Sequence, residues 1–339
     1  MRNASPSVLM ILGLVLFGVQ EARADAAPFV GIQQMLDVSE AMVASDLPPT
    51  QNIYGSVRAI RWSTDASLPD SGTIPATVPT DAHYLNANCA SYTSMFLTAA
   101  LHNHGFEQRL VPGSSGPIAA GDSVFIKALS AKAETDATGV PSSGGYGPTP
   151  GDYANFILQG TRVPVNKLAA APQGGFERVA NVQSLQRGDV LAIKHHNTCG
   201  ADGFDCSGHM ATVVAAPVAL PERSNRTYFN GVVCDEYKVR IADVTSSTHG
   251  DQKVRSSQGE ILADRDTRVI VNPDGSLKEK RSGLGAGTMI LCAQAGTGAI
   301  VGHRWSFASS DTYSNIDGNT YSNGKAVRSI VAGRLTVDE

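Results

Sequence analysis

Three side chains in this sequence have the types and surroundings that thiol-based acyl transfer requires, namely Cys89, His209 and Asp243. Cys89 follows Asn88 and opens an apolar run that repeats every three to four residues up to Gly105, which predicts the first turn of a helix. Unpaired backbone N–H groups and the helix dipole at that position favour an anion, and so the reactive thiolate. A buried, unreactive thiol is the alternative interpretation.

The predicted base and its orienting group come from two strands that follow one another. His209 opens the β-branched run GHMATVV, and Asp243 ends the alternating run YKVRIADV. An imidazole beside the sulfur can take up its proton, and a carboxylate on the far ring nitrogen can fix the tautomer and the orientation of the ring. A turn-capping role for Asp243 remains open at this stage.

The cysteine count supports a free thiol at position 89. Five cysteines are present, at positions 89, 199, 206, 234 and 292, and an odd number leaves at least one thiol unpaired in a monomer. Cys199 and Cys206 bracket a short loop, and Cys234 and Cys292 both lie near predicted strands. We expect the disulfides Cys199–Cys206 and Cys234–Cys292, although four cysteines permit three connectivities.

The first residues predict export. Arg2 precedes the apolar stretch 7–19, and Ala22-Arg23-Ala24 is a small-x-small cleavage site, so residues 1–24 read as a signal peptide. No later segment reaches the roughly 18 apolar residues of a membrane span, so we expect no stable membrane insertion after cleavage. A periplasmic or extracellular location also fits paired cysteines.

Composition narrows the class of protein. A formal net charge of -4 offers no basic excess for phosphates, which argues against nucleic-acid binding. Helical periodicity dominates before about residue 130 and strand patterns follow from Val179, which predicts an α+β fold. The expected organisation is a helical, turn-rich segment at 25–80, a catalytic core at 81–252, and a β-rich extension at 253–339 that either joins the core or stands apart.

A zinc site is a competing interpretation of one cluster. His195, His196, Cys199, Cys206 and His209 lie within fifteen residues. Structural zinc sites show tighter ligand pairs, and an oxidising compartment favours a disulfide over thiolate ligation. We therefore predict neither a metal nor a cofactor.

The order of these motifs resembles a known group of enzymes. The matching residues are Asn88-Cys89-Ala90-Ser91, Gly188-Asp189-Val190-Leu191-Ala192-Ile193 and Ser207-Gly208-His209-Met210-Ala211-Thr212-Val213-Val214. A cysteine opening a helix, a Gly-Asp strand and a Gly-His strand in this order resemble the papain-like NlpC/P60 and CHAP superfamily. This sequence departs from the usual Asp-Cys-Ser-Gly motif, spaces Cys89 and His209 by 120 residues, and has an aspartate as the third residue.

The resemblance implies a papain-like core, with the nucleophile helix packed on an antiparallel sheet and extra strands at the C-terminus. It also implies hydrolysis of an amide or peptide bond through a thioester, with peptidoglycan stem peptides as the leading substrate. Family members add a side-chain oxyanion donor, for which Tyr84, Asn86 and Asn88 are candidates. His249 is an alternative orienting or substrate-contact residue. An acyltransferase, a protein-directed cysteine peptidase and a non-catalytic envelope binding module are the rival functions.

Overall fold

The computed structural model describes residues 29–62, 70–103, 123–129, 133–135, 141–143, 147–166, 171–198, 206–228, 231–249, 265–307, 309, 313–315 and 328–338. The predicted signal peptide at residues 1–24 and the predicted disulfide partner Cys199 lie outside the described residues. Within these ranges, no helix combines the length and the apolar character that crossing a membrane requires.

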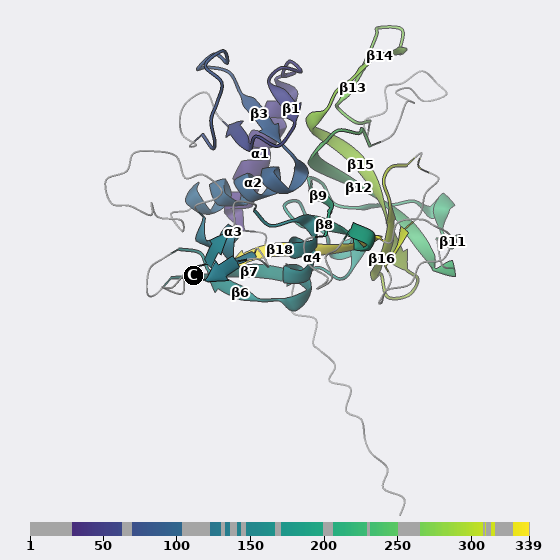
Figure 1. Ribbon diagram of the computed structural model, residues 1–339. Coiled ribbons are helices and arrows are strands. Elements are labelled where there is room, and N and C mark those ends of the chain that lie inside the picture. Colours follow the sequence, from purple (N-terminus) through teal and green to yellow (C-terminus); the bar gives the residue numbers. More distant parts are fainter. Residues whose placement is uncertain are drawn as a thin grey trace, which may run out of the picture.

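The described secondary structure consists of four α-helices, eighteen strands and three short 3₁₀ helices (Figure 1). The helices are α1 (Val30–Ala44), α2 (Cys89–Asn103), α3 (Val124–Leu129) and α4 (Pro150–Gln159). The strands of the first half are β1 (Asn52–Tyr54), β2 (Ala59–Arg61), β3 (Tyr84–Ala87), β4 (Ala133–Thr135), β5 (Pro141–Ser143), β6 (Arg162–Pro164), β7 (Gln173–Arg178) and β8 (Val190–His195). The remaining strands are β9 (Gly208–Val213), β10 (Val218–Ala219), β11 (Arg226–Thr227), β12 (Val233–Thr245), β13 (Val269–Val271), β14 (Leu277–Lys280), β15 (Gly283–Gln294), β16 (Ile300–Arg304), β17 (Tyr313–Ser314) and β18 (Arg328–Val337).

The fold is a mixed α+β arrangement dominated by antiparallel strands, as the sequence predicts. Among the described residues, eleven strands form one sheet whose main order is β17-β16-β15-β12-β9-β8-β18-β7-β6, with β10 and β11 pairing to β12. Strands from the predicted core and strands that follow residue 253 therefore belong to the same sheet, and β18 lies between β8 and β7 of the core. A separate small sheet, β1-β3-β2, joins the large one where the Asn52 side chain bonds both backbone groups of Leu284 on β15.

The large sheet curls on itself. Strands β16 and β17 also contact β18, which lies several places away in the strand order. The Asn315 amide closes this gap, because it donates to the carbonyls of Ile300 and Ile330 and accepts from the N–H of Ile330. The curled strands thus enclose an interior, and their far face carries the helices.

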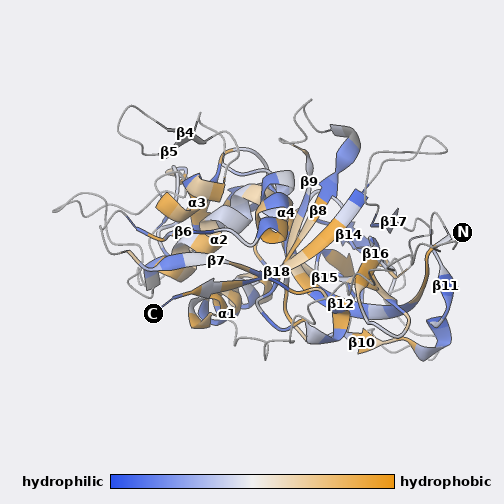
Figure 2. Ribbon diagram, turned by 90° about the horizontal axis from the view of Figure 1, so that it is seen from below, coloured by the Kyte–Doolittle hydropathy of each residue, from blue (hydrophilic) through white to orange (hydrophobic). Residues whose placement is uncertain are grey.

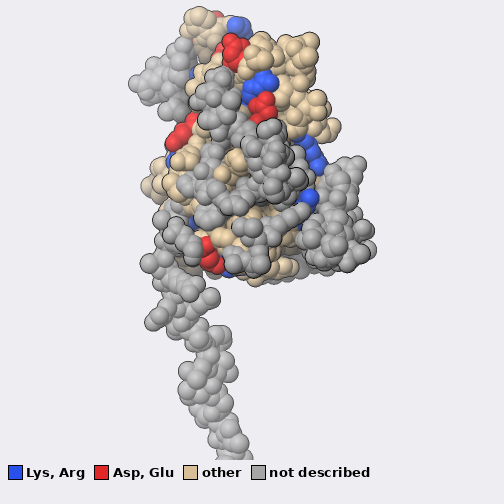
Figure 3. Space-filling view, turned by 90° about the vertical axis from the view of Figure 1, so that its left-hand side faces the viewer, with Lys and Arg blue, Asp and Glu red and all other residues tan. Residues whose placement is uncertain are grey.

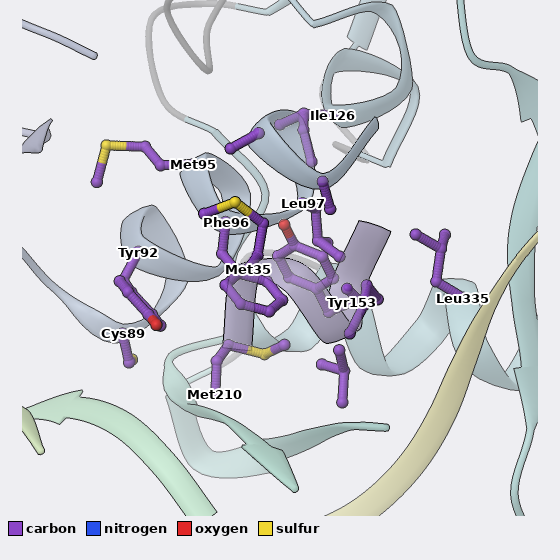
Figure 4. Packing of buried hydrophobic residues seen from close by; sticks show 14 of the residues in the cluster. Met35, Cys89, Tyr92, Met95, Phe96, Leu97, Ile126, Tyr153, Met210 and Leu335 are labelled. Atoms are coloured by element: carbon purple, nitrogen blue, oxygen red, sulfur yellow. The ribbon is translucent and has the colours of Figure 1, made fainter. Parts of the chain in front are cut away.

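Alternation along the central strands builds two cores. On β8, Val190 and Ala192 face the helices, whereas Leu191 and Ile193 face the interior of the curled sheet. The helix-side core combines α1, α2, α3 and α4 with the outer face of the sheet, and Figure 4 shows its packing around Phe96. The apolar residues concentrate on the central strands and the inward sides of the helices in Figure 2. Period-two patterning on both faces is what a doubly covered strand requires.

The Gly-Asp motif before β8 has a structural explanation. Gly188 has a φ of +100°, which favours glycine at this turn. The buried Asp189 carboxylate accepts two hydrogen bonds from the Arg334 guanidinium on β18, at 2.8 and 2.9 Å, and one from the Gln186 N–H at 2.8 Å. The motif therefore ties the start of β8 to its neighbour in the sheet.

The disulfide prediction is confirmed for one pair. Cys234 on β12 and Cys292 on β15 are bonded, with a Cα–Cα distance of 5.5 Å. Cys206 is also disulfide-bonded, and Cys89 is a free, buried thiol. The cysteine that the sequence singles out as reactive is thus available for chemistry.

Candidate active site

Cys89 is the first residue of α2, as its sequence context predicts. Asn88 caps the helix, because its side-chain oxygen accepts a hydrogen bond from the Ser91 N–H at 2.8 Å. The next turns anchor the helix through Tyr92 and Phe96, whose rings pack with Trp62 in the helix-side core. In Figure 4, Cys89 lies at the margin of this core, beside Tyr92. The core therefore fixes the helix end that carries the sulfur.

The Cys89 sulfur meets the His209 imidazole across the α2–β9 contact. The two side chains are hydrogen-bonded, and the backbone N–H of Met210 donates to the same sulfur. Burial opposes ionisation of the thiol, but the His209 charge and these two hydrogen bonds outweigh it and lower the pKa of Cys89. Burial likewise opposes protonation of His209, yet the charge and hydrogen bonds of Cys89 and Asp243 raise its pKa to about 9. Each group therefore favours the charged form of the other, which is the direction that a thiolate–imidazolium pair requires.

Asp243 holds the other side of the His209 ring. Its Oδ2 atom accepts from His209 Nε2 at 2.6 Å, which leaves Nδ1 of the imidazole for the sulfur. The carboxylate is fully buried. Burial alone would raise the pKa of Asp243, but the Arg268 guanidinium and the His249 charge, with the two imidazole hydrogen bonds, hold it well below its usual range. Asp243 is thus an ionised acceptor that fixes the ring in one orientation.

His249 supports Asp243 rather than facing solvent. Its Nε2 atom lies 2.7 Å from the same Asp243 oxygen, and its Nδ1 atom lies 2.8 Å from the Trp305 carbonyl oxygen. Both partners are acceptors, so both contacts are hydrogen bonds only when the ring donates from both nitrogens. The residue is 3% exposed. Of its two predicted roles, orienting and substrate contact, this geometry fits the orienting one.

A buried ion pair behind Asp243 escaped the sequence analysis. Arg268 donates to Asp243 Oδ1 at 2.8 Å and to both oxygens of Asp266. Asp266 also accepts from the backbone N–H of His249 at 2.6 Å. The local signal is weak, since Asp266-Thr267-Arg268 is an ordinary charged tripeptide. Only the packing of this segment beneath β12 reveals its role.

Trp305 covers the carboxylate–histidine contact. Its ring stacks on His249 at a centroid distance of 4.0 Å and meets His209 edge-on at 4.7 Å. The Trp305 indole N–H donates to the Thr248 carbonyl at 3.3 Å. A half-buried indole in this position limits the access of water to the His209–Asp243 hydrogen bond.

Tyr54 is a further residue near Cys89 that the sequence did not point to. Strand β1 runs parallel to β3, and this register pairs Tyr54 with Ala87, two residues before Cys89. Burial, and then the charge of Cys89, raises the pKa of the Tyr54 phenol. The side chain is 40% exposed, so a hydroxyl donor lies near the sulfur at the surface of the protein.

The three oxyanion candidates on and after β3 have different environments. Tyr84 is 3% exposed, which places it in the interior. The Asn86 side-chain oxygen is buried without a hydrogen-bond partner. The Asn88 oxygen is occupied by the helix cap, although its amide N–H groups remain possible donors. Tyr54 is the more exposed donor beside Cys89.

The geometry of the histidine–aspartate cluster fits hydrogen bonds better than a metal. The ligand atoms of His209, Asp243 and His249 lie within 4.8 Å of one another. The nitrogen–oxygen contacts of 2.6 and 2.7 Å are hydrogen-bond lengths, and a nitrogen that donates a proton has no lone pair for a metal. Arg268 adds a positive charge on the same carboxylate. In the alternative zinc cluster, Cys206 is disulfide-bonded and Cys199 is not described.

Comparison with known proteins gives a distant viral match. An uncharacterized protein of Acanthamoeba polyphaga mimivirus is 28% identical over 171 residues, which cover 49% of this chain and 60% of the viral protein. No family model matches the chain. No solved structure matches it either. The site must therefore be interpreted from its own geometry.

Proposed function

We propose that this protein is an exported cysteine hydrolase that cleaves an amide or peptide bond through Cys89, His209 and Asp243. The observation that carries the proposal is the chain of contacts from the Cys89 sulfur through the imidazole to a buried carboxylate 2.6 Å beyond it. A thiolate that is free, close to a helix N-terminus and paired with an imidazolium is the arrangement that acyl transfer requires.

The reaction follows from these positions. The thiolate attacks the carbonyl carbon, and the oxygen of the tetrahedral intermediate takes the electron pair of the carbonyl π bond. Collapse breaks the carbon–nitrogen bond while the His209 imidazolium gives its Nδ1 proton to the departing amine. Neutral His209 then removes a proton from water, whose oxygen attacks the thioester, and the thiolate and imidazolium are restored.

Two donors suit the developing oxyanion. The Cys89 backbone N–H lies at the start of α2, where helical N–H groups lack intrahelical acceptors. Tyr54 is 40% exposed and close enough for the charge of Cys89 to raise the pKa of its phenol, so we assign its hydroxyl as a second donor. A tyrosine from β1 thereby takes the part that the family resemblance assigns to a polar residue just upstream of the nucleophile.

Peptidoglycan stem peptides are the substrate class that we propose to test first. The support is the resemblance of the Cys, Gly-Asp and Gly-His motifs to NlpC/P60 and CHAP enzymes, together with the predicted signal peptide and the disulfide at Cys234. Among the described residues visible in Figure 3, basic and acidic side chains are interspersed.

Selective alkylation tests the proposed nucleophile. The folded protein is treated with iodoacetamide at pH 6 to 7, and the adduct is mapped by peptide mass spectrometry. We expect labelling of Cys89 at least about tenfold faster than a free thiol such as glutathione at pH 6, because the lowered thiol pKa keeps the thiolate populated. His209→Gln should remove most of that advantage. An inert Cys89 contradicts the hydrolase and favours a binding module.

Cell-wall digestion then tests the substrate. Purified peptidoglycan is incubated with the wild type and with Cys89→Ala, and the released peptides are identified by mass spectrometry. New amine ends from the wild type but not from the variant support an amidase or peptidase. A reactive Cys89 without cleavage of peptidoglycan, but with cleavage of denatured protein, indicates a protein-directed peptidase. Tyr54→Phe should lower kcat by about tenfold through the loss of one oxyanion donor, and buried Tyr84→Phe serves as its control.

A further inference from the structure

A second polar cluster lies beside the candidate triad, at the same end of the curled sheet. Register pairs His209 with Ile193, and Ile193 with Ile330, so these side chains share the inner face. Two positions further along, His195 on β8 pairs with Arg328 on β18. The alternation of side chains puts His195 and Arg328 on the same inner face as the candidate base.

His303 and Tyr313 form the neighbouring side of this cluster. His303 on β16 pairs with Leu291, which belongs to the interior core, and with Tyr313 on β17. The His303 and Tyr313 rings stack at a centroid distance of 5.2 Å, and the Arg328 guanidinium carbon lies 4.4 Å from the centre of the Tyr313 ring. One tyrosine ring thus links Arg328 to a histidine of the interior.

Several polar atoms of this cluster are buried without a partner. His303 is 1% exposed, and neither of its ring nitrogens has a hydrogen-bond partner. The Nε atom of Arg328 is also buried without a hydrogen-bond partner, although the residue as a whole is only half-buried. Buried polar groups are normally satisfied, so such atoms point to a ligand that completes them.

The electrostatic surroundings select the sign of that ligand. Burial first, and then the charges of Arg328 and His209 among others, lowers the pKa of His195 to about 4. Burial, and then Arg328, His195 and His209, lowers the pKa of His303 to about 3. The charges that lower these two pKa values are those of arginine and histidine side chains. With pKa values this low both rings are neutral at neutral pH, so Arg328 supplies the positive charge that an anion would meet and the neutral rings supply N–H donors.

We propose that His195, His303 and Arg328 form a subsite for a carboxylate of the substrate, next to the scissile bond that Cys89 attacks. This rests on the proposed function and narrows its substrate to amides or peptides that carry a free carboxylate close to the cleaved bond. Half-buried Arg328 and His195 receive the carboxylate at the mouth of the curled sheet. His303 forms the floor and donates from one ring nitrogen.

Two alkylating reagents that differ mainly in charge test the subsite. Iodoacetate carries a carboxylate and iodoacetamide is neutral, and in both the thiolate displaces iodide at a CH₂ group. The measured quantity is the rate ratio of iodoacetate to iodoacetamide at Cys89. We expect Arg328→Gln to lower this ratio by about fivefold, because a partly desolvated charge near the reagent is removed. Arg226→Gln, which loses the same charge at an exposed and remote position on β11, should leave it unchanged.

Protection of the unaltered protein gives a second measurement that does not depend on a variant. N-acetylglycine should slow the labelling of Cys89 by iodoacetamide more than N-acetylglycinamide does at equal concentration. N-acetylglutamic acid α-amide, whose carboxylate is on the side chain, shows by comparison which position of the carboxylate fits the site.

The outcomes separate this proposal from the one on which it rests. If iodoacetamide does not label Cys89 in the wild type, the hydrolase proposal fails together with the subsite. If Cys89 is reactive, but Arg328→Gln keeps the wild-type ratio or neither carboxylate protects better than the glycinamide, the subsite alone is overturned. The iodoacetamide rate of Arg328→Gln reports whether the triad remains intact in that variant.

Discussion

Two buried aspartate–arginine pairs in the same sheet differ in what their carboxylates reach. Asp189, before β8, gives both oxygens to Arg334, and one of them also accepts the backbone N–H of Gln186. Asp243, on β12, gives one oxygen to Arg268 and the other to His209 and His249. Both carboxylates are fully buried.

The difference shows that burial and an arginine do not by themselves make a carboxylate functional. Taking two charges out of water offsets much of their attraction, so neither pair is evidence of net stability. The Asp189 carboxylate binds Arg334 and the Gln186 N–H, and so ties the start of β8 to β18. Asp243 lies near the end of its strand. There its carboxylate accepts a hydrogen bond from His209, and the other side of that ring is hydrogen-bonded to the Cys89 sulfur. The strand end, rather than the ion pair, distinguishes the two sites.

The largest effect on stability should come from breaking the Asp189–Arg334 pair. Asp189→Asn leaves Arg334 buried without its counter-ion, so we expect the free energy of unfolding to fall by about 3–5 kcal/mol. Urea unfolding followed by circular dichroism measures this loss. The iodoacetamide rate of Cys89 in the folded variant should stay within about twofold of the wild type, because the Asp189 carboxylate is held by Arg334 and Gln186. A large loss of thiol reactivity would erase the distinction between the two pairs.

The matching change at the other pair should act on the thiol. Asp243→Asn removes the hydrogen bond and the charge that, after the charge of Cys89, raise the pKa of His209, so that pKa falls. A less protonated His209 lowers the thiol pKa less, and this outweighs the smaller direct effect of the Asp243 charge, so the pKa of Cys89 rises. We expect the labelling rate of Cys89 at pH 6 to fall by about tenfold or more, because a smaller fraction of the thiol is ionised once its pKa rises. The rate is measured as a function of pH and normalised to the fraction of folded protein.

Asp243→Asn also perturbs a buried network, so a loss of stability accompanies the loss of reactivity. Its labelling rate should nevertheless recover at high pH, where even an unassisted thiol ionises. A variant that stays unreactive above pH 9 would indicate a displaced helix rather than a lost charge, and the assigned role of Asp243 would then be wrong.

The contrast between the two pairs also marks what sequence could predict. Helical spacing after Asn88 places Cys89 at the start of α2, and strand alternation places His209 and Asp243 on neighbouring strands. These signals are local in sequence. The odd number of cysteines and their positions near strands likewise led to the Cys234–Cys292 pairing.

The partners of the two aspartates were not predictable in the same way. Arg334 lies 145 residues after Asp189, and Arg268 meets Asp243 through the folding-back of a charged tripeptide. Tyr54 reaches Cys89 only because β1 is parallel to β3. One of the contacts across the curl of the large sheet comes from Asn315, for which no periodic pattern exists. Long-range register therefore supplied the parts of the site that periodicity could not.

The pH dependence should separate hydrolysis from alkylation. His209 has a raised pKa of about 9, so the imidazolium that protonates the leaving amine is present below that value and lost as the pH rises through it. Hydrolysis should therefore decline by about tenfold per pH unit above 9. Alkylation needs only the thiolate, so its rate should not fall over the same range. Parallel losses in the two assays would mean that the protein unfolds there.

The smallest effect, and the finest test of the comparison, is expected from His249→Gln. This change removes one of the two histidines that share an Asp243 oxygen, so that oxygen keeps His209 as its histidine partner. Asp243 then acts more strongly on His209, and a nearby positive charge is gone. The pKa of His209 should rise above about 9, and the alkaline limit of hydrolysis should move to higher pH by about half a unit.

The rate itself should fall by about threefold in His249→Gln, because Asp243 loses one of the contacts that hold it in place. His102→Gln, on the last turn of α2, is the matched control and should change neither the rate nor the alkaline limit. A purely structural role for His249 would lower the rate without moving the limit. A shift of the alkaline limit to lower pH would mean that His249 supports the protonated form of His209. The proposal that the two histidines compete for Asp243 Oδ2 would then be wrong.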